Sequence, residues 1–169
     1  MQHHVYYIVI TTLHILAGIM WTGSLLFMSL LLVPALRTLE NPPLMARLIQ
    51  TVGRRYRVAG WISLGVLLVT GYLALNVRGI SHAMLVDPAF WSSTFGQTLA
   101  WKLTLFAGVV GLSAAHDIMS GPRLRRLRET NPAAAERQRM LASWMGRVTL
   151  ALSLLIVALG VMLVRGRPW

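Results

Sequence analysis

Residues 95–115 read FGQTLAWKLTLFAGVVGLSAA, a stretch that is apolar and long enough to cross a membrane. It carries Lys102 as its eighth residue. A lysine at membrane depth is expensive to place, so it marks a candidate site and needs a partner. His14, within the first apolar stretch of the chain, is the best candidate for that partner. We therefore predict a polar site built around these two side chains.

The composition indicates that the whole chain, and not residues 95–115 alone, belongs to a membrane protein. Hydrophobic residues make up 56% of it and the mean hydropathy is +0.61, which is too apolar for an ordinary soluble domain. We predict an all-α fold, a polytopic membrane protein with an antiparallel bundle of four transmembrane helices in a single domain over residues 1–169. The predicted helices cover residues 5–36, 57–78, 95–120 and 141–165.

Prolines and glycines set the expected breaks between these helices. Asn41-Pro42-Pro43 interrupts the chain, and residues 44–51 are expected to form a short separate helix before Gly53. Asn131-Pro132 is expected to begin a second short helix that leads into the fourth span. Gly121-Pro122 is a stop signal for the third span. The N-terminus lacks the basic residues of a signal peptide, so we expect the first helix to be retained.

The net charge of +11 does not indicate a nucleic-acid partner, because the basic residues gather in two loops. The first loop holds Arg37, Arg47, Arg54, Arg55 and Arg57, and the second holds Arg123, Arg125, Arg126, Arg128, Arg137 and Arg139. Positively charged loops stay in the cytoplasm, so we predict a multi-pass protein of a bacterial-type inner (plasma) membrane with both termini outside. We expect anionic lipid head groups to contact both loops.

Helical periodicity gives three spans a polar stripe, since positions seven apart nearly share a face. The stripes are His14, Trp21 and Met28; Tyr56, Ser63 and Thr70; and Lys102, Val109 and His116. Polar groups avoid lipid, so we expect the stripes to face the interior of the bundle.

Depth in the membrane divides the polar residues into two predicted clusters. At about 1.5 Å per residue, His14 and Lys102 both lie about 10–12 Å below the outer surface. The outer cluster is His14, Lys102 and Trp21, with Asn76 or Tyr72. The inner cluster is Tyr56, His116, Asp117 and Arg147, with Arg55.

Structural roles compete with this interpretation. His14 can serve as a simple hydrogen bond between helices, and Lys102 can extend its long stem toward the outer surface. Asp117 with Arg147 is an expected structural ion pair, and Thr70 is expected to contribute mainly to packing and hydrogen bonding within the membrane.

The sequence also limits the chemistry. It contains no cysteine, which excludes disulfides and thiolate metal sites, and the histidines left for a metal on the outer side are His3, His4 and His82. Paired carboxylates, a nucleophile elbow and a phosphate loop are absent, so no catalytic residue is assigned.

Five short motifs together resemble the CopD-like membrane protein superfamily over essentially the whole chain. They are LHILAGIMWTG at residues 13–23, Arg54-Arg55-Tyr56-Arg57, Thr70-Gly71, Lys102-Leu103, and His116-Asp117 followed by Gly121-Pro122. The superfamily includes copper-resistance membrane proteins. It also includes the HemJ-type protoporphyrinogen oxidases, four-helix proteins that use a first-helix histidine and bind haem b.

The resemblance implies two hypotheses, and a third stands beside them. In a copper transport or resistance protein, which is not an enzyme, His14 is an intramembrane ligand and His3, His4, His82 and Met84 capture the ion outside. In a haem-b oxidoreductase, His14 is an axial ligand, with Lys102 and Trp21 also at the cofactor. The third hypothesis is a structural or assembly subunit, in a homo-oligomer or a larger membrane complex. The sequence leaves copper and haem b undecided.

Overall fold

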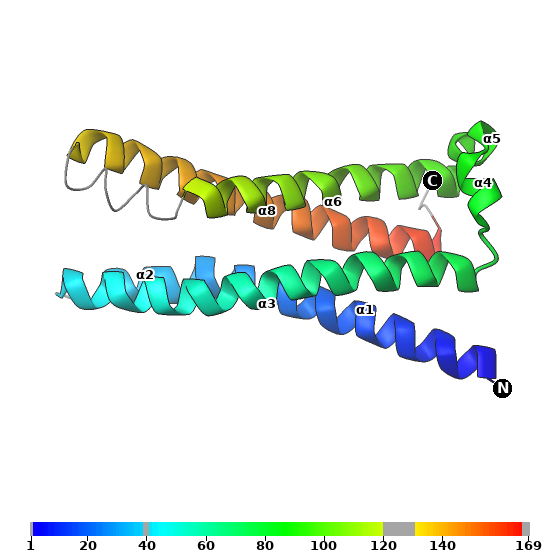
Figure 1. Cartoon of the computed structure of the whole chain (residues 1–169), viewed down its shortest axis with the longest axis horizontal. Coiled ribbons are helices and arrows are strands. Elements are labelled where there is room, and N and C mark those ends of the chain that lie inside the picture. Colours follow the sequence, from blue (N-terminus) through cyan, green and yellow to red (C-terminus); the bar gives the residue numbers. More distant parts are fainter. Residues whose placement is uncertain (1, 39–40, 120–130, 167–169) are drawn as a thin grey trace. The chain divides into compact units, whose positions relative to one another are not determined.

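The computed structural model describes residues 2–38, 41–119 and 131–166 (Figure 1). Within these ranges, all regular structure is helical, and four helices are long and apolar enough to cross a membrane. They are His4–Leu36, Pro43–Val77, Thr94–Met119 and Glu136–Arg165. The predicted all-α membrane fold is therefore confirmed. The helices fall into two compact units, Met1–Gln97 and Thr98–Trp169, and each is described by itself. The prediction of one domain over residues 1–169 stays a prediction.

The first span is one rod made of three helical pieces. α1 covers Gln2–Leu26, a π-helical segment η1 covers Phe27–Leu32, and α2 covers Val33–Arg37. The backbone N–H of Val33 bonds to the carbonyl of Met28, five residues back. Pro34 follows and has no N–H for the carbonyl one turn earlier, so the wider turn lets the helix continue through the proline.

The second span, α3, is a single helix over Pro42–Val77, 36 residues long. The predicted separate helix over residues 44–51 is therefore wrong, and the helix that contains the predicted span over residues 57–78 begins at Pro42. The side chain of Asn41 caps α3 by accepting a hydrogen bond from the Leu44 N–H at 3.1 Å. Gly53 does not break it, because a glycine inside a helix costs only about 1 kcal/mol relative to alanine.

Two short helices, α4 (His82–Val86) and α5 (Pro88–Ser92), follow α3 in the first unit. The turn into them passes through Gly79, whose φ of +80° is left-handed and favours glycine. Within this unit α1 packs along α3, and the two helices run antiparallel.

The second unit consists mainly of α6 (Thr94–Met119), whose first residues belong to the first unit, and α8 (Pro132–Arg165). Asn131 caps α8 at 3.0 Å from the Ala134 N–H, and the helix continues without a break. The predicted short helix before the fourth span is thus wrong, because a single helix runs from Pro132 through the span. The two helices run antiparallel, since Gln138 of α8 donates to the Met119 carbonyl at 2.5 Å. Gly121-Pro122 and Arg123, Arg125, Arg126 and Arg128 lie outside the described residues.

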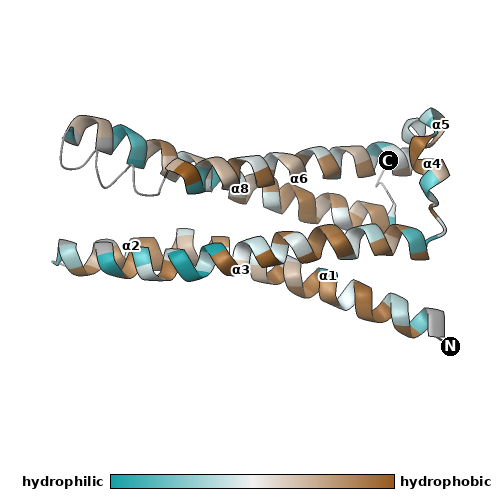
Figure 2. Cartoon of the chain, viewed as in Figure 1, coloured by the Kyte–Doolittle hydropathy of each residue, from teal (hydrophilic) through white to brown (hydrophobic). Residues whose placement is uncertain are grey.

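The surface of the long helices is apolar along much of their length. Figure 2 shows hydrophobic residues over α1, the second half of α3, and α8 toward its C-terminus. Large apolar side chains such as Ile19 (62% exposed) and Val161 (57%) face outward. Exposed apolar surface of this extent is expected where helices contact lipid rather than water.

Candidate functional site

His14 is held by a hydrogen bond across two helices of the first unit. Its ring nitrogen Nδ1 lies 2.8 Å from the hydroxyl oxygen of Thr70 in α3. Thr70 is buried, with 5% of its surface exposed, and its hydroxyl also donates to the Val66 carbonyl one turn earlier at 2.6 Å. The sequence predicted Lys102 as the partner of His14; the structure gives it Thr70. Lys102 belongs to the second unit, so the shared His14–Lys102 pocket stays a prediction.

Two glycines let the helices approach closely around this imidazole. A Cβ added to Gly71 would lie 3.3 Å from Cε1 of His14 and 3.8 Å from Nδ1. One turn further along α1, a Cβ on Gly18 would lie 3.9 Å from a methyl carbon of Leu67. Thr70-Gly71 therefore combines a hydroxyl for the ring with the space that the ring occupies. The Thr70 hydroxyl is a signal in the sequence that could have predicted this contact, but the prediction considered only a charged partner for His14.

Trp21 and Tyr56 form an aromatic pair deeper along the same two helices. Their rings stack with centroids 6.2 Å apart and planes inclined at 26°. Trp21 is 6% exposed, and a Cβ on Gly60 would lie only 2.9 Å from its ring. The sequence analysis placed Trp21 in an outer cluster and Tyr56 in an inner one. The two rings nevertheless meet across α1 and α3, while the division into two clusters by membrane depth stays a prediction.

Lys102 lies against α8 within the second unit. A Cβ on Gly160 would lie 3.5 Å from the Lys102 Nζ, so the glycine leaves room for the ammonium group. Thr98, one turn earlier on α6, is buried with 3% exposed, and Lys102 itself is half-buried. The amine thus packs against a helix within a segment long and apolar enough to span a membrane, and a charge at the centre of such a span costs about 2.5–3.5 kcal/mol on insertion scales.

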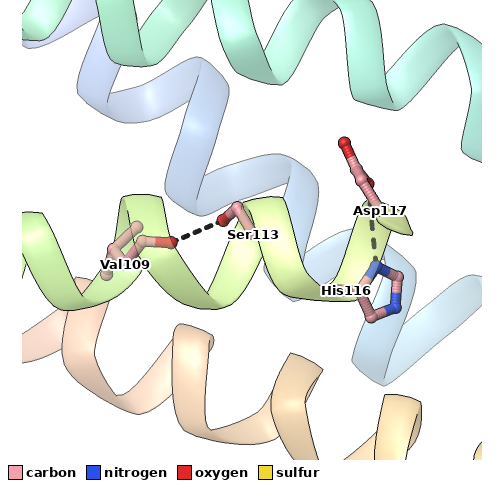
Figure 3. Close-up of polar contacts among 4 residues, drawn as sticks. All are labelled: Val109, Ser113, His116 and Asp117. Carbon is pink, nitrogen blue, oxygen red and sulfur yellow. Dashed lines mark hydrogen bonds and ion pairs between the residues drawn. The ribbon is translucent and has the colours of Figure 1, made fainter. Parts of the chain in front are cut away.

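The predicted inner residues of the second unit lie near the end of α6. Figure 3 shows Nδ1 of His116 3.8 Å from a carboxylate oxygen of Asp117, and the Ser113 hydroxyl donating to the Val109 carbonyl at 2.7 Å. The guanidinium of Arg147 lies 5.5 Å from the centroid of the Trp144 ring. That is a cation–π geometry, common at membrane interfaces. The predicted Asp117–Arg147 ion pair stays a prediction.

The candidate capture groups lie at one end of the first unit. His82 in α4 is exposed, and its Nε2 lies 2.6 Å from the Tyr72 hydroxyl of α3. Met84 is 43% exposed and lines an open cleft of about 540 Å³ together with Arg78, Ile80, Asp87, Phe90, Ser93 and Phe95. His4 is exposed on the first turns of α1, and the side chain of His3 lies outside the described residues.

Among the residues that the structure describes, no three His, Asp or Glu side chains gather closely enough to hold an ion. The described histidines, His14 included, therefore belong to no such group.

Comparison with known proteins assigns the chain to a family. The family described as Copper resistance protein D matches residues 50–163, about two thirds of the chain. The chain belongs to the copper resistance protein D family. It is thus a multi-pass membrane protein related to copper resistance. The matched region contains Thr70, Gly71, Lys102 and His116, and His14 precedes it.

A relative from Aquifex aeolicus (strain VF5), described as an uncharacterized protein, is 32% identical over 150 residues. The alignment covers 88% of this chain and 89% of the relative, so the likeness extends beyond the family region. No solved structure matches the chain. The distant similarity to HemJ-type proteins stays a prediction.

Proposed function

We propose that this protein passes copper through a bacterial plasma membrane, with His14 as an intramembrane ligand for the ion. The observation that carries the proposal is the hydrogen bond from His14 to the buried Thr70, which holds the imidazole between α1 and α3 in a family related to copper resistance. A histidine within a span is costly unless it is used, and imidazole is a good copper ligand.

The few metal-binding side chains around His14 suit transient binding of a transported ion better than permanent binding in a structural site. Structural metal sites close their coordination shell with about four protein ligands, whereas His14 supplies one imidazole and the described residues hold no group of three ligands. Passage requires binding strong enough for entry and weak enough for release. In this proposal, His4, His82 and Met84, with His3, receive the ion on the outer side.

Copper content and the optical spectrum of the purified full-length protein test the proposal. We expect copper by elemental analysis after growth with copper, and His14→Ala should lower it to background while the helical circular dichroism spectrum persists. His116→Ala is the matched control, because it removes an imidazole from the end of α6 and should retain the wild-type copper content.

Two other results would replace the proposal. A Soret band that disappears in His14→Ala would identify haem b instead of copper. Copper content, spectrum and copper tolerance unchanged by His14→Ala would leave the structural-subunit hypothesis.

We also propose the orientation that the arginines favour, with both termini outside and both basic loops in the cytoplasm. The described arginines of the first loop, Arg47, Arg54, Arg55 and Arg57, are all exposed on the first half of α3. They precede the apolar part of that helix, so they lie where anionic lipid head groups would meet it.

A further inference from the structure

The Val66 carbonyl, which also contacts the Thr70 hydroxyl, indicates where the protons lie in the His14–Thr70 contact. A threonine hydroxyl carries one proton, and a backbone carbonyl can only accept. Because Thr70 donates its proton to the Val66 carbonyl at 2.6 Å, its oxygen is left to accept. Both contacts of the Thr70 hydroxyl are hydrogen bonds at the same time only when the His14 nitrogen 2.8 Å away is the donor, so the complete arrangement carries a hydrogen on Nδ1.

This assignment fixes the chemistry of the opposite ring nitrogen. In a neutral imidazole, a hydrogen on Nδ1 places the lone pair on Nε2. Metal-binding histidines in proteins are commonly held in this way, with one ring N–H bonded to a protein oxygen and the other nitrogen on the metal. Thr70 and Val66 form a comparable arrangement behind His14.

We propose that Thr70 is a positioning residue that holds His14 in the Nδ1–H tautomer and makes Nε2 the atom that binds copper. This inference rests on the proposed function. Thr70 does not touch the ion; it acts through the ring, and its role is distinct from the packing role that its position in a helix interior would otherwise indicate.

The surroundings of the ring support a fixed orientation. Thr70 is 5% exposed, so water does not compete for its hydroxyl. The Cβ position of Gly71 lies 3.3 Å from Cε1, so the backbone of α3 borders the ring edge between the two nitrogens. Rotating the ring by 180° about its bond to Cβ would place a carbon, Cδ2, near Thr70 and lose the hydrogen bond. The geometry thus favours one orientation and one tautomer together.

The tautomer can be measured without copper. Nitrogen-15 NMR of the metal-free, full-length protein labelled at histidine distinguishes protonated from unprotonated ring nitrogens, and the His14→Gln variant identifies the His14 signals. We expect Nδ1 to be protonated and Nε2 unprotonated in the wild type. Thr70→Val keeps the shape of the side chain without its hydroxyl, and it should move the proton toward Nε2. Thr70→Ser should restore the wild-type pattern.

Copper binding supplies the second readout. Cuprous ion, buffered by a competing chelator, should bind Thr70→Val about 10-fold to 100-fold more weakly than the wild type, the usual cost of losing such an outer hydrogen bond. Thr70→Ser should bind within a few-fold of the wild type. A merely structural threonine would change thermal stability without changing the tautomer.

The two proposals fail in different ways. A wild-type His14 protonated on Nε2 overturns the positioning role, whatever the copper result, and this outcome does not depend on the folding of a Thr70 variant. The expected tautomer combined with copper binding that survives His14→Ala overturns the copper function and, with it, the choice of Nε2 as ligand.

Discussion

At the scale of single residues, the orientation of the His14 imidazole is set by an uncharged neighbour, the Thr70 hydroxyl. The sequence pointed to a lysine, yet the group that the structure gives His14 is a buried hydroxyl from the neighbouring helix. A hydroxyl partner of this kind adds no charge beside the imidazole, and a neutral imidazole is the form that binds a metal. Within its own unit, Lys102 places its ammonium group beside Gly160.

The first prediction concerns Gly71. Gly71→Ala places a methyl 3.3 Å from Cε1 of His14, tighter than ordinary van der Waals contact, so the ring must shift by a few tenths of an ångström. We expect copper binding to weaken about 10-fold, because a displaced ring lengthens its bond to Thr70. Gly65→Ala is the control: a Cβ there meets nothing within 4 Å, and helix propensity alone should stabilise the protein by up to about 1 kcal/mol. Equal copper affinities in the two variants would contradict the prediction.

A second residue-scale prediction concerns the Trp21–Tyr56 pair. Gly60→Ala would bring a Cβ to 2.9 Å from the Trp21 ring, which real Cβ atoms essentially never show. We expect a loss of about 1–3 kcal/mol in the free energy of unfolding, the usual cost of overpacking. Thermal or denaturant unfolding in a fixed detergent measures it.

The double variant Trp21→Leu with Gly60→Ala separates steric from other effects. A smaller side chain at residue 21 should remove most of the cost of Gly60→Ala, although Trp21→Leu has a cost of its own. If the loss of unfolding free energy in the double variant equals the sum of the losses in the two single variants, the Trp21 ring is not the steric obstacle to Gly60→Ala.

At the scale of elements, α3 is longer than the membrane requires. Its 36 residues rise about 54 Å at 1.5 Å per residue, against a hydrocarbon core of about 30 Å. The first turns therefore extend past the lipid tails, and there the helix is amphipathic. Met45, Ile49, Val52 and Tyr56 are half-buried on one side, whereas Arg47, Arg54, Arg55 and Arg57 are exposed on the other.

This arginine face gives the third prediction. Replacing Arg54, Arg55 and Arg57 together by Gln should weaken the preference for anionic lipid, since each arginine near a membrane surface contributes about 1 kcal/mol. The measurement is the gain in thermal stability in phosphatidylglycerol nanodiscs over phosphatidylcholine nanodiscs. Arg165→Gln, at the far end of α8, is the control and should keep the wild-type gain. An unchanged gain in the triple variant would argue against the lipid contact.

At the scale of the whole molecule, the fourth prediction is the orientation in the membrane. The chain has no cysteine, so each introduced thiol is the only one present. In intact cells, Ala83→Cys in α4 should react with a membrane-impermeant thiol reagent, and Gln50→Cys in α3 should react only after the cells are opened. Both positions are exposed in the structure. The reverse pattern would place the basic loops outside and invert the proposed path of copper.

The sequence by itself determined the class of fold and the four spans. Apolar length is a local property of the chain, and lipid requires each spanning backbone to satisfy its own hydrogen bonds as a helix. The sequence did not predict where α3 and α8 start. Pro42 and Pro132 follow capping asparagines and lie in the first turn of a helix, where proline is tolerated, so they begin the long helices instead of interrupting the chain.

Only the tertiary structure decided which residues meet. Periodicity placed His14 and Thr70 on polar stripes, but the pairing of one helix with another depends on the axial register and on where glycines allow close approach. That register brings His14 to Thr70 and Gly71, and Trp21 to Tyr56 and Gly60. Contacts between helices arise from side-chain packing over residues far apart in sequence, and no local pattern specifies them.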